Sequence, residues 1–247
     1  MEIKGKTAII TGATGKLTRV LAIQLAKAGV NCICIFHKNS IQAKNLRAAI
    51  HRLKVKSLFI KADLTMPENI EKIFADIERF AKPQILINAA AVFEKKTIED
   101  ITFGYVRQTL DVNFTASIMM VQRFVEFVRK KIKQRQEPIG KIINIADVII
   151  QRPQAGFSIY SASKAALIAT TKSLAKELAP DFAVNAVSPG IINWSKGTAA
   201  KQKKRILAHI PAGRTGRPEE VAEAVKFLIE NDYITGQIIN VDGGKSL

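Results

Sequence analysis

The chain has 247 residues, 47% of them hydrophobic, and a formal net charge of +17. This length and apolar content suffice for one large core, and no apolar run reaches the roughly 18 residues that a membrane span needs. The first residues, MEIKGKTAIITGATG, enter a strand-like run at once and show no signal-peptide pattern. We therefore expect one soluble cytoplasmic domain over residues 1–247, with no membrane partner.

The positive charge is spread along the chain, with one dense run, KQKKR, at residues 201–205. It is compatible with an acidic carrier protein, an anionic cofactor or nucleic acid as a partner. Because the chain carries no helix-turn-helix or RNA-binding signature, we interpret the scattered lysines as solvated surface and expect no nucleic-acid partner. Cys32 and Cys34 share one face of an expected strand, which favours burial over a metal site. We expect no bound metal.

Apolar runs of strand length alternate with longer amphipathic segments. The first strand, at residues 7–11, precedes a helical pattern over residues 16–29, in which Gly29 marks the stop. Six further strands are expected at residues 31–36, 57–62, 84–90, 141–146, 182–188 and 237–244. Buried strands separated by helices predict an α/β, single-domain Rossmann-type doubly wound fold, with a seven-stranded parallel sheet and helices on both faces. Such folds bind ligands outside the carboxyl ends of their strands.

The first strand ends in a glycine-rich turn, TGATGK, and a helix follows. Gly12 and Gly15 allow backbone N–H groups to approach a pyrophosphate at the helix N-terminus. Turns of this kind also occur without a ligand. The turn is therefore compatible with a dinucleotide and does not by itself establish one.

The second strand ends in FHKNS, where a dinucleotide site meets the adenosine ribose. His37, Lys38, Asn39 and Ser40 offer donors and no acid. This composition favours the 2′-phosphate of NADP over the free 2′-hydroxyl of NAD. Ser40 can also be the N-cap of the following helix, and both interpretations can hold together.

Polar residues also follow the third and fourth strands. Asp63 ends the third, in KADL, and Asn88 ends the fourth, in INAAAVF. These positions correspond to the adenine and to the ribose next to the nicotinamide. Phe93 lies five residues past Asn88 in a loop, where packing and a platform for a flat ligand are both open.

Tyr160 and Lys164 are four residues apart on one helical face, and Asp147 precedes the tyrosine by thirteen residues. A nearby ammonium lowers the pKa of a phenol, so the tyrosine is expected to act as an acid or base near neutral pH. An exposed Tyr–Lys pair without a role is the alternative. The fifth strand ends just upstream and places this helix beside the expected ligand crevice, which favours the functional interpretation.

These residues together resemble the short-chain dehydrogenase/reductase family over essentially the whole chain. The matching motifs are TGATGKLT, ADL, INAAA, DVN at residues 111–113, YSASK, NAVSPG and ITGQIINVDGG. The resemblance implies that Tyr160 is the proton donor, that Lys164 holds the nicotinamide ribose and that Asn113 anchors a proton relay. The cofactor site that it implies comprises Gly12, Gly15, Lys16, Leu17, His37, Lys38, Asn39, Ser40, Asp63, Leu64, Asn88, Ala89, Ala90, Tyr160, Lys164, Pro189, Gly190 and Ile192.

The chain departs from the family pattern at several positions. Lys16 and Thr18 replace the second and third glycines of the usual turn, and Asp147 replaces the usual catalytic serine. Pteridine reductases and dihydromonapterin reductases resemble the chain in the basic turn residue, in HKNS, in the position of Phe93 and in the aspartate. The resemblance to this branch implies a substrate site of Phe93, Asp147, Tyr160, Lys16 and Trp194.

The chemistry of Asp147 points to the same substrates. Reducing a ketone builds negative charge on oxygen, and an ionised aspartate about 4 Å away opposes it by roughly 4 kcal/mol, or about a thousandfold in rate. Staying protonated would avoid this penalty but requires desolvation. A C=N nitrogen instead gains a proton as hydride adds to carbon. Asp147 fits either as a partner of Tyr160 in that proton delivery or as an acceptor for the amino edge of a pterin.

We therefore expect an NADPH-dependent reductase of a pterin C=N bond, with Tyr160 as the proton donor assisted by Lys164 and Asp147. One alternative is a 3-oxoacyl carrier-protein reductase or another carbonyl reductase, which the basic run at residues 201–205 would suit. A second is a catalytically silent NADP-binding regulatory relative, which the missing turn glycines suggest. Retention of Asn113 with the tyrosine and lysine argues against the silent relative.

Residues 191–212 form the segment that usually covers the substrate. Trp194 replaces the usual threonine there, and lining the substrate pocket and packing the cover are both open. The family resemblance also implies a homotetramer formed through helices around residues 100–135 and 157–179.

Overall fold

The structure is a computed structural model that describes residues 1–131, 138–194 and 199–247. Its centre is a seven-stranded sheet with the strand order β3-β2-β1-β4-β5-β6-β7, in which every pair of neighbours runs parallel. The predicted doubly wound fold is therefore confirmed. The strands are β1 Thr7–Ile10, β2 Asn31–Phe36, β3 Ser57–Lys61, β4 Ile85–Asn88, β5 Gly140–Ile145, β6 Phe182–Pro189 and β7 Ile238–Val241.

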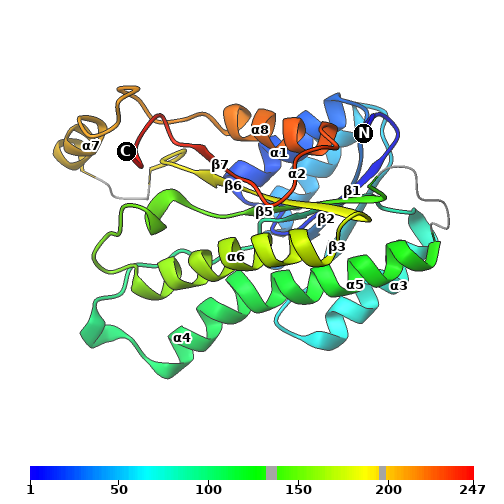
Figure 1. Cartoon of the computed structure of the whole chain (residues 1–247), viewed down its shortest axis with the longest axis horizontal. Helices are drawn as coiled ribbons and strands as arrows, with labels where there is room; N and C mark the ends of the chain where they lie inside the picture. Colours follow the sequence, from blue (N-terminus) through cyan, green and yellow to red (C-terminus); the bar gives the residue numbers. More distant parts are fainter. Residues whose placement is uncertain (132–137, 195–198) are drawn as a thin grey trace.

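Helices cover both faces of this sheet (Figure 1). One face is covered by α1 (Lys16–Lys27), α2 (Ser40–His51) and α8 (Pro218–Glu230), and the other by α3 (Pro67–Phe80), α5 (Ala116–Lys131) and α6 (Ser158–Glu177). A short helix, α7 (Ala200–Leu207), lies at one end of the molecule near the C-terminus. No helix in the described ranges is both long enough and apolar enough to cross a membrane.

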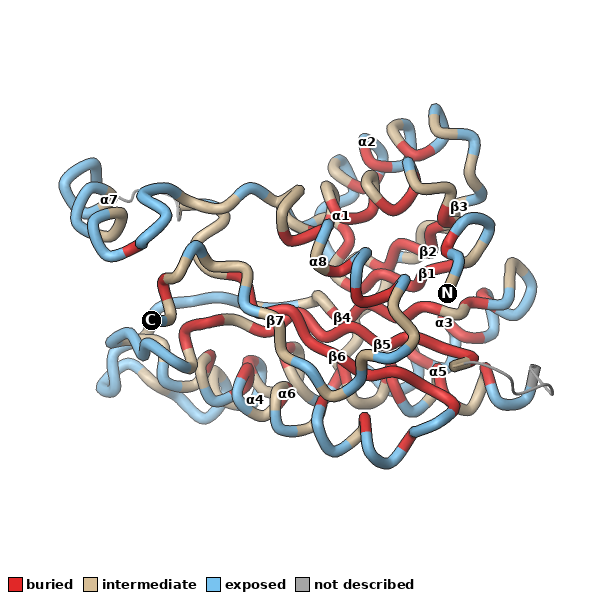
Figure 2. The backbone as a smooth tube through the Cα atoms, turned by 45° about the horizontal axis from the view of Figure 1, so that its top comes forward, coloured by how far each residue is buried: buried red, intermediate tan, exposed pale blue. Residues whose placement is uncertain are grey.

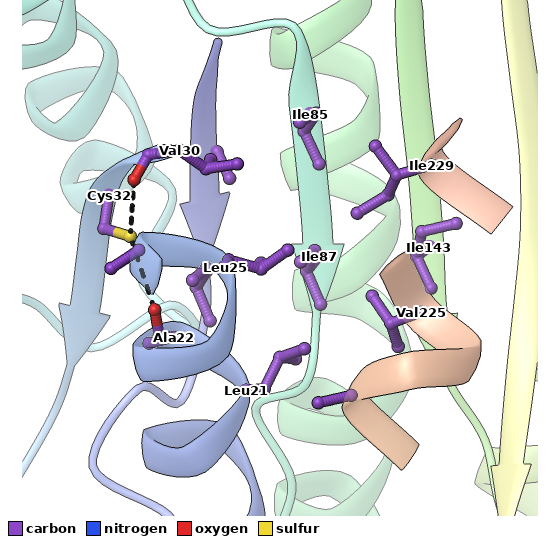
Figure 3. Packing of buried hydrophobic residues seen from close by; sticks show 14 of the residues in the cluster. Leu21, Ala22, Leu25, Val30, Cys32, Ile85, Ile87, Ile143, Val225 and Ile229 are labelled. Atoms are coloured by element: carbon purple, nitrogen blue, oxygen red, sulfur yellow. Dashed lines mark hydrogen bonds between the residues drawn. The ribbon is translucent and has the colours of Figure 1, made fainter. Parts of the chain in front are cut away.

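Two apolar cores, one on each face, hold the helices to the sheet. Figure 3 shows the first, where Leu21 and Leu25 of α1 lie beside Ile87 of β4. Val225 of α8 completes that contact, and Phe124 of α5 is fully buried in the core on the opposite face. Burying each side chain of this size contributes about 1.5–3 kcal/mol. The inner strands β2, β1, β4, β5 and β6 are buried along most of their length, red in Figure 2, which explains why their sequences are mostly apolar rather than alternating. The edge strands β3 and β7 are only partly buried.

The strand order reverses between β1 and β4, which leaves their carboxyl ends side by side. The hydroxyl of Thr11, just after β1, accepts hydrogen bonds from the N–H groups of Ala89 (2.9 Å) and Ala90 (3.1 Å), just after β4. Ligands bind doubly wound sheets at this switch point, because the crossovers leave a crevice there.

Candidate active site

Tyr160, Lys164 and Asp147 meet beyond the end of β5. Both α6 residues are buried, with exposed fractions of 6% for Tyr160 and 2% for Lys164. The hydroxyl of Tyr160 donates to Oδ2 of Asp147 at 2.8 Å, and the N–H of Ile149 donates to Oδ1 at 2.8 Å. The ammonium of Lys164 donates to the carbonyl of Ile145, also at 2.8 Å. The carboxylate is therefore fixed on both oxygens, with the phenol on the side of the cavity described below.

Burial sets the protonation behaviour of these three groups. It raises the pKa of Asp147, although the hydrogen bond from Ile149 and the neighbouring charges oppose the rise. Burial, and then the nearby Asp147 carboxylate, raise the pKa of Tyr160 well above its usual value. Burial lowers the pKa of Lys164 to about 8.

Lys164, which the family resemblance places beside the phenol, is not the direct hydrogen-bond partner of Tyr160 in this structure. The ammonium lies 5.8 Å from the centroid of the tyrosine ring and is bonded to the backbone instead. The aspartate is the direct partner of the phenol, and an anion that accepts a hydrogen bond favours the neutral phenol.

Asn113 lies in a π-helical turn, Asp111–Thr115, between α4 (Phe103–Leu110) and α5. Its side chain is fully buried, accepts from the N–H of Val92 at 2.8 Å and donates to Ser163 at 3.0 Å. Ser163 in turn donates to the carbonyl of Tyr160 at 2.6 Å. Short π-helical segments often occur at functional sites. Here the turn connects the loop after β4 to the helix that carries the tyrosine.

Asn88 has a different position from the one expected beside a ribose. It is buried, and its amide donates to the side chain of Asn144 on β5 at 3.0 Å. Asn144 donates to the hydroxyl of Thr171 on α6 at 2.9 Å. These hydrogen bonds connect β4, β5 and α6 to one another. Asn88 therefore has a structural position and does not line either of the hollows described next.

A cavity of about 610 Å³, here called the Tyr160 cavity, opens beside the tyrosine. Phe93 lies at its wall and is 53% exposed. Its ring stacks on Phe157 at 4.7 Å between centroids and meets the ring of Tyr160 edge-on at 4.7 Å. Phe157, which sequence reasoning missed, therefore occupies one side of the expected platform. The other predicted residues lining this cavity are Leu17, Ala89, Asp147, Lys164, Pro189, Gly190, Ile192 and Trp194.

A second hollow of about 360 Å³, here called the glycine-turn hollow, lies at the end of β1. Gly12 has φ of +63°, and an added Cβ would lie 2.8 Å from the Cα of Ala90, so the turn requires glycine. Ala89 lines both hollows, which makes them neighbours. The predicted residues in the lining of this hollow are Gly12, Gly15, His37, Lys38, Asn39, Asp63, Ala89 and Ala90.

One acid also faces the basic residues of this hollow. His37 lies 3.5 Å from the carboxylate of Asp63. The N–H and hydroxyl of Thr65 donate to Asp63 at 3.0 and 2.7 Å, and these bonds hold the pKa of Asp63 below its usual value. The carboxylate is therefore already engaged with its own loop.

Besides Asn88 and Asn113, three further predicted residues lie outside both hollows. Lys16 is exposed at the first position of α1, outside the lining of both hollows, and Leu64 packs against the apolar core. Ser40 is the first residue of α2 and not its cap. The cap is Asn39, whose side chain accepts from the N–H of Gln42 at 3.2 Å, because an amide one residue earlier reaches the free N–H groups of the first turn.

Thr18, which stands in the sequence at the position of a missing glycine, has a structural role of its own. Its hydroxyl donates to the carbonyl of Gly12 at 2.6 Å and lies 3.2 Å from that of Gly15. These hydrogen bonds stabilise the turn between β1 and α1, although a threonine stands where the family pattern has a glycine. Its place inside that pattern was the signal that could have revealed the role.

Comparison with known proteins identifies the group of enzymes to which this site belongs. Residues 12–246 match the family described as "Enoyl-(Acyl carrier protein) reductase". The chain belongs to the short-chain dehydrogenase/reductase family. It is 37% identical to the 3-oxoacyl-[acyl-carrier-protein] reductase FabG of Aquifex aeolicus, with 99% of each chain covered. It is 32% identical to an NAD-dependent glycerol dehydrogenase of Listeria innocua, over all of this chain and 96% of that one.

Solved structures of the same family share the fold over the whole chain. A short-chain dehydrogenase/reductase from Serratia marcescens has a TM-score of 0.90 at 26% identity, with both chains covered completely. A short-chain dehydrogenase from Burkholderia cenocepacia, solved in complex with NADP, has a TM-score of 0.90 at 28% identity over both complete chains. The family membership predicted from the motifs is thus confirmed. The relatives named as FabG favour the 3-oxoacyl alternative over the pterin interpretation.

Proposed function

We propose that this oxidoreductase uses NADPH to reduce a C=N bond in a flat, pterin-like heteroaromatic ring. The observation that carries the proposal is the 2.8 Å hydrogen bond from Tyr160 to Asp147 at the wall of the Tyr160 cavity. A carbonyl reductase needs a neutral donor at this position. A carboxylate bonded to the phenol suits a substrate that accepts a proton on nitrogen and develops positive charge.

The residues of the glycine-turn hollow support NADP as the cofactor. Gly12 permits close approach of a pyrophosphate to the start of α1, and His37 and Lys38 supply donors where a 2′-phosphate would lie. The only carboxylate among the described lining residues, Asp63, is held by Thr65. Bound NADPH would supply the hydride. In this proposal Pro189 and Gly190 flank its nicotinamide, and Lys164 holds the adjoining ribose.

The residues at and behind the Tyr160 cavity divide the remaining work in this proposal. Tyr160 gives its proton to the substrate nitrogen, and Asp147 orients the phenol. Asn113 and Ser163 hold the helix turn that carries the tyrosine. Phe93, backed by Phe157, offers the remaining side of its ring to a planar substrate, which aromatic rings favour in offset stacks.

A side-by-side assay tests the proposal. Purified protein is given NADPH with either a dihydropterin or an acetoacetyl thioester, and NADPH oxidation is followed by absorbance. We expect the higher kcat/KM with the dihydropterin. Faster turnover of the thioester would contradict the proposal. A crystal soaked with NADPH and methotrexate should place the pteridine ring beside Phe93, with its amino edge near Asp147.

The second candidate is reduction of a 3-oxoacyl thioester, and two observations favour it. The named relatives include FabG enzymes at 37%, 35% and 33% identity. In addition, the burial of Asp147 that raises its pKa is the desolvation a protonated acid requires. A neutral Asp147 could donate to a carbonyl oxygen, as the usual serine does.

The catalytically silent alternative is less well supported. The missing glycines that suggested it are compensated by Thr18, whose hydroxyl closes the turn. Tight NADPH binding without turnover of any pterin, quinone or carbonyl substrate would revive it.

We also propose a homotetramer. An apolar groove of about 550 Å³ runs between α5 and α6 and is lined in part by Ile118, Val125 and Leu174. It lies within the two helical segments expected at the subunit interface, of which residues 132–135 are outside the described part of the chain. Light scattering coupled to size exclusion should give a mass near four times the 27.2 kDa of one chain.

A further inference from the structure

A third pocket, of about 360 Å³, adjoins the Tyr160 cavity on the side of α7. The two spaces share Gln154, Ala155, Gln202, Ile206 and Lys245 in their linings. A ligand whose reacting end lies beside Tyr160 can therefore extend into this second space. We call it the basic pocket, because of the charges described next.

The basic pocket collects basic side chains from distant parts of the chain. Arg152 follows β5, Arg205 and His209 lie on and after α7, and Lys245 is close to the C-terminus. Among the described residues of its lining, none is acidic. Like charges gathered in one concave site repel each other, and an anion bound among them relieves that repulsion.

Lys245 is the least exposed of these basic residues, at 9%. Within the described part of the chain, its ammonium makes no hydrogen bond or ion pair, although its charge favours the ionised forms of Asp147 and Asp242. Arg152 is bonded to the backbone carbonyl of Lys245 at 3.3 Å. Lys245 therefore presents at the pocket lining a positive charge that no described residue pairs with directly. It stands where the basic pocket meets the Tyr160 cavity, ready to contact an incoming anion.

We propose that the basic pocket is a subsite for a carboxylate or phosphate at the far end of the substrate. The proposal rests on the proposed function, because it assumes that the reacting group of the same molecule lies beside Tyr160. Arg205 and Arg152 supply planar donor groups that match an oxyanion, and Lys245 supplies a point charge between the two spaces. The preferred substrates are thus those that carry a negatively charged tail.

Two pairs of substrates distinguish whether the anion bound in the basic pocket is a carboxylate or a phosphate. Dihydrofolate carries two carboxylates on its glutamyl tail, whereas dihydrobiopterin has an uncharged side chain. Acetoacetyl-coenzyme A carries phosphates, whereas the acetoacetyl thioester of N-acetylcysteamine is uncharged. The quantity compared is the ratio of kcat/KM, charged over uncharged, within each pair.

Arg205→Gln should lower this ratio about tenfold in whichever pair is turned over, mostly through KM of the charged member. Lys245→Gln should act in the same direction. The matched control is Lys204→Gln, which removes the same charge from an exposed position of α7 outside the pocket lining, and should leave the ratio unchanged. Equal ratios in wild type and Arg205→Gln, or an equal loss in the control, would overturn the proposal.

Binding without turnover separates this proposal from the proposed function. Calorimetry on the NADP complex, which has no hydride to transfer, compares folate with pterin and coenzyme A with N-acetylcysteamine. We expect tighter binding of the charged member of at least one pair, weakened about tenfold by Arg205→Gln. If this holds while every assay of turnover fails, the anion subsite stands and the proposed reaction is wrong. If Arg205→Gln changes none of the affinities, the subsite is wrong.

Discussion

A tyrosine and an aspartate joined by one hydrogen bond titrate as a pair. Asp147 caps the short helical turn Val148–Ile150 through its bond to the N–H of Ile149, so its position is set by backbone as well as by Tyr160. The usual serine of the family cannot carry charge, whereas this residue can. Under the proposed function, the identity of this one side chain decides whether the cavity favours a substrate that gains positive or negative charge.

Replacing Asp147 tests that dependence directly. We expect Asp147→Ser to lower kcat/KM for a dihydropterin about a hundredfold and to raise it for an acetoacetyl thioester, since a neutral donor suits a carbonyl oxygen. Asp147→Asn serves as the control, because its amide oxygen can still accept from Ile149 while the charge is lost. The measurement is steady-state NADPH oxidation. A serine variant that lowers both activities equally would contradict a role in substrate choice.

The proposed role of Lys164 predicts a reaction that is sensitive to alkaline pH. Its ammonium must stay protonated to offset charge on Tyr160 as the phenol gives up its proton, and burial lowers its pKa to about 8. We therefore expect kcat/KM to be constant well below pH 8 and to fall about tenfold per pH unit above it. Tyr160, whose pKa lies well above its usual value, adds no decline in this range. A profile that stays level to pH 9.5 would show that Lys164 titrates elsewhere.

Among the elements, the turn between β1 and α1 depends most on a single residue. Gly12→Ala forces a side chain at positive φ against the backbone of Ala90. We expect the free energy of unfolding to fall by about 2–4 kcal/mol and dinucleotide binding to weaken. Urea denaturation and NADPH titration measure the two effects.

The control for this variant lies in α4. An added Cβ at Gly104 meets nothing within 4 Å, and alanine favours a helix over glycine. Gly104→Ala should therefore stabilise the protein by about 0.5–1 kcal/mol. If both alanine variants change stability alike, the close approach of the turn to β4 is not what requires glycine at residue 12.

Strands and helix ends were predicted best where a single physical cause determines the local structure. The strands follow from mostly apolar runs, since both faces of the inner strands of a parallel sheet are buried. The stop of α1 follows from Gly29, whose φ is +83°. The π-helical turn around Asn113 has no such signal, because its geometry depends on contacts with Val92 and Ser163 that lie far away in the sequence.

The sequence predicted which residues come together at the candidate site better than it predicted how they interact. Motif spacing brought Tyr160, Lys164 and Asp147 together correctly, but their pKa shifts come from burial, which a sequence does not display. The basic pocket gathers Arg152 and Lys245 from separate segments and could not be recognised before the fold was known.

At the scale of the whole molecule, an ion pair between a buried lysine and a partly exposed aspartate connects separate parts of the chain. Lys141, fully buried on β5, lies 2.6 Å from the carboxylate of Asp232, just after α8, and donates to the carbonyl of Asn231 at 2.7 Å. Asp232 also forms an ion pair with the N-terminal ammonium of Met1. The pair therefore holds the first residue, the centre of the sheet and the end of a surface helix together.

Removing the acid should be costly because it leaves the ammonium buried and unpaired. We expect Asp232→Ala to lower the free energy of unfolding by about 3–5 kcal/mol. Glu71→Ala breaks an exposed pair with Arg123, whose nitrogen lies 2.7 Å from the carboxylate, and should change stability by about 0.5 kcal/mol or less. Urea denaturation of both variants at pH 7 gives the comparison. Similar losses in both would mean that Lys141 finds another partner.

The burial of the two thiols makes the protein convenient for site-directed labelling. Cys32 and Cys34 are the only cysteines in the sequence, and both are free and buried. Burial raises the pKa of Cys32 to about 12 and that of Cys34 well above its usual value. Maleimides react with thiolates, so they should leave the folded wild type unmodified. A thiol introduced by Lys204→Cys on α7 would then carry the sole spin label or fluorophore, and could report directly how that helix responds to ligands.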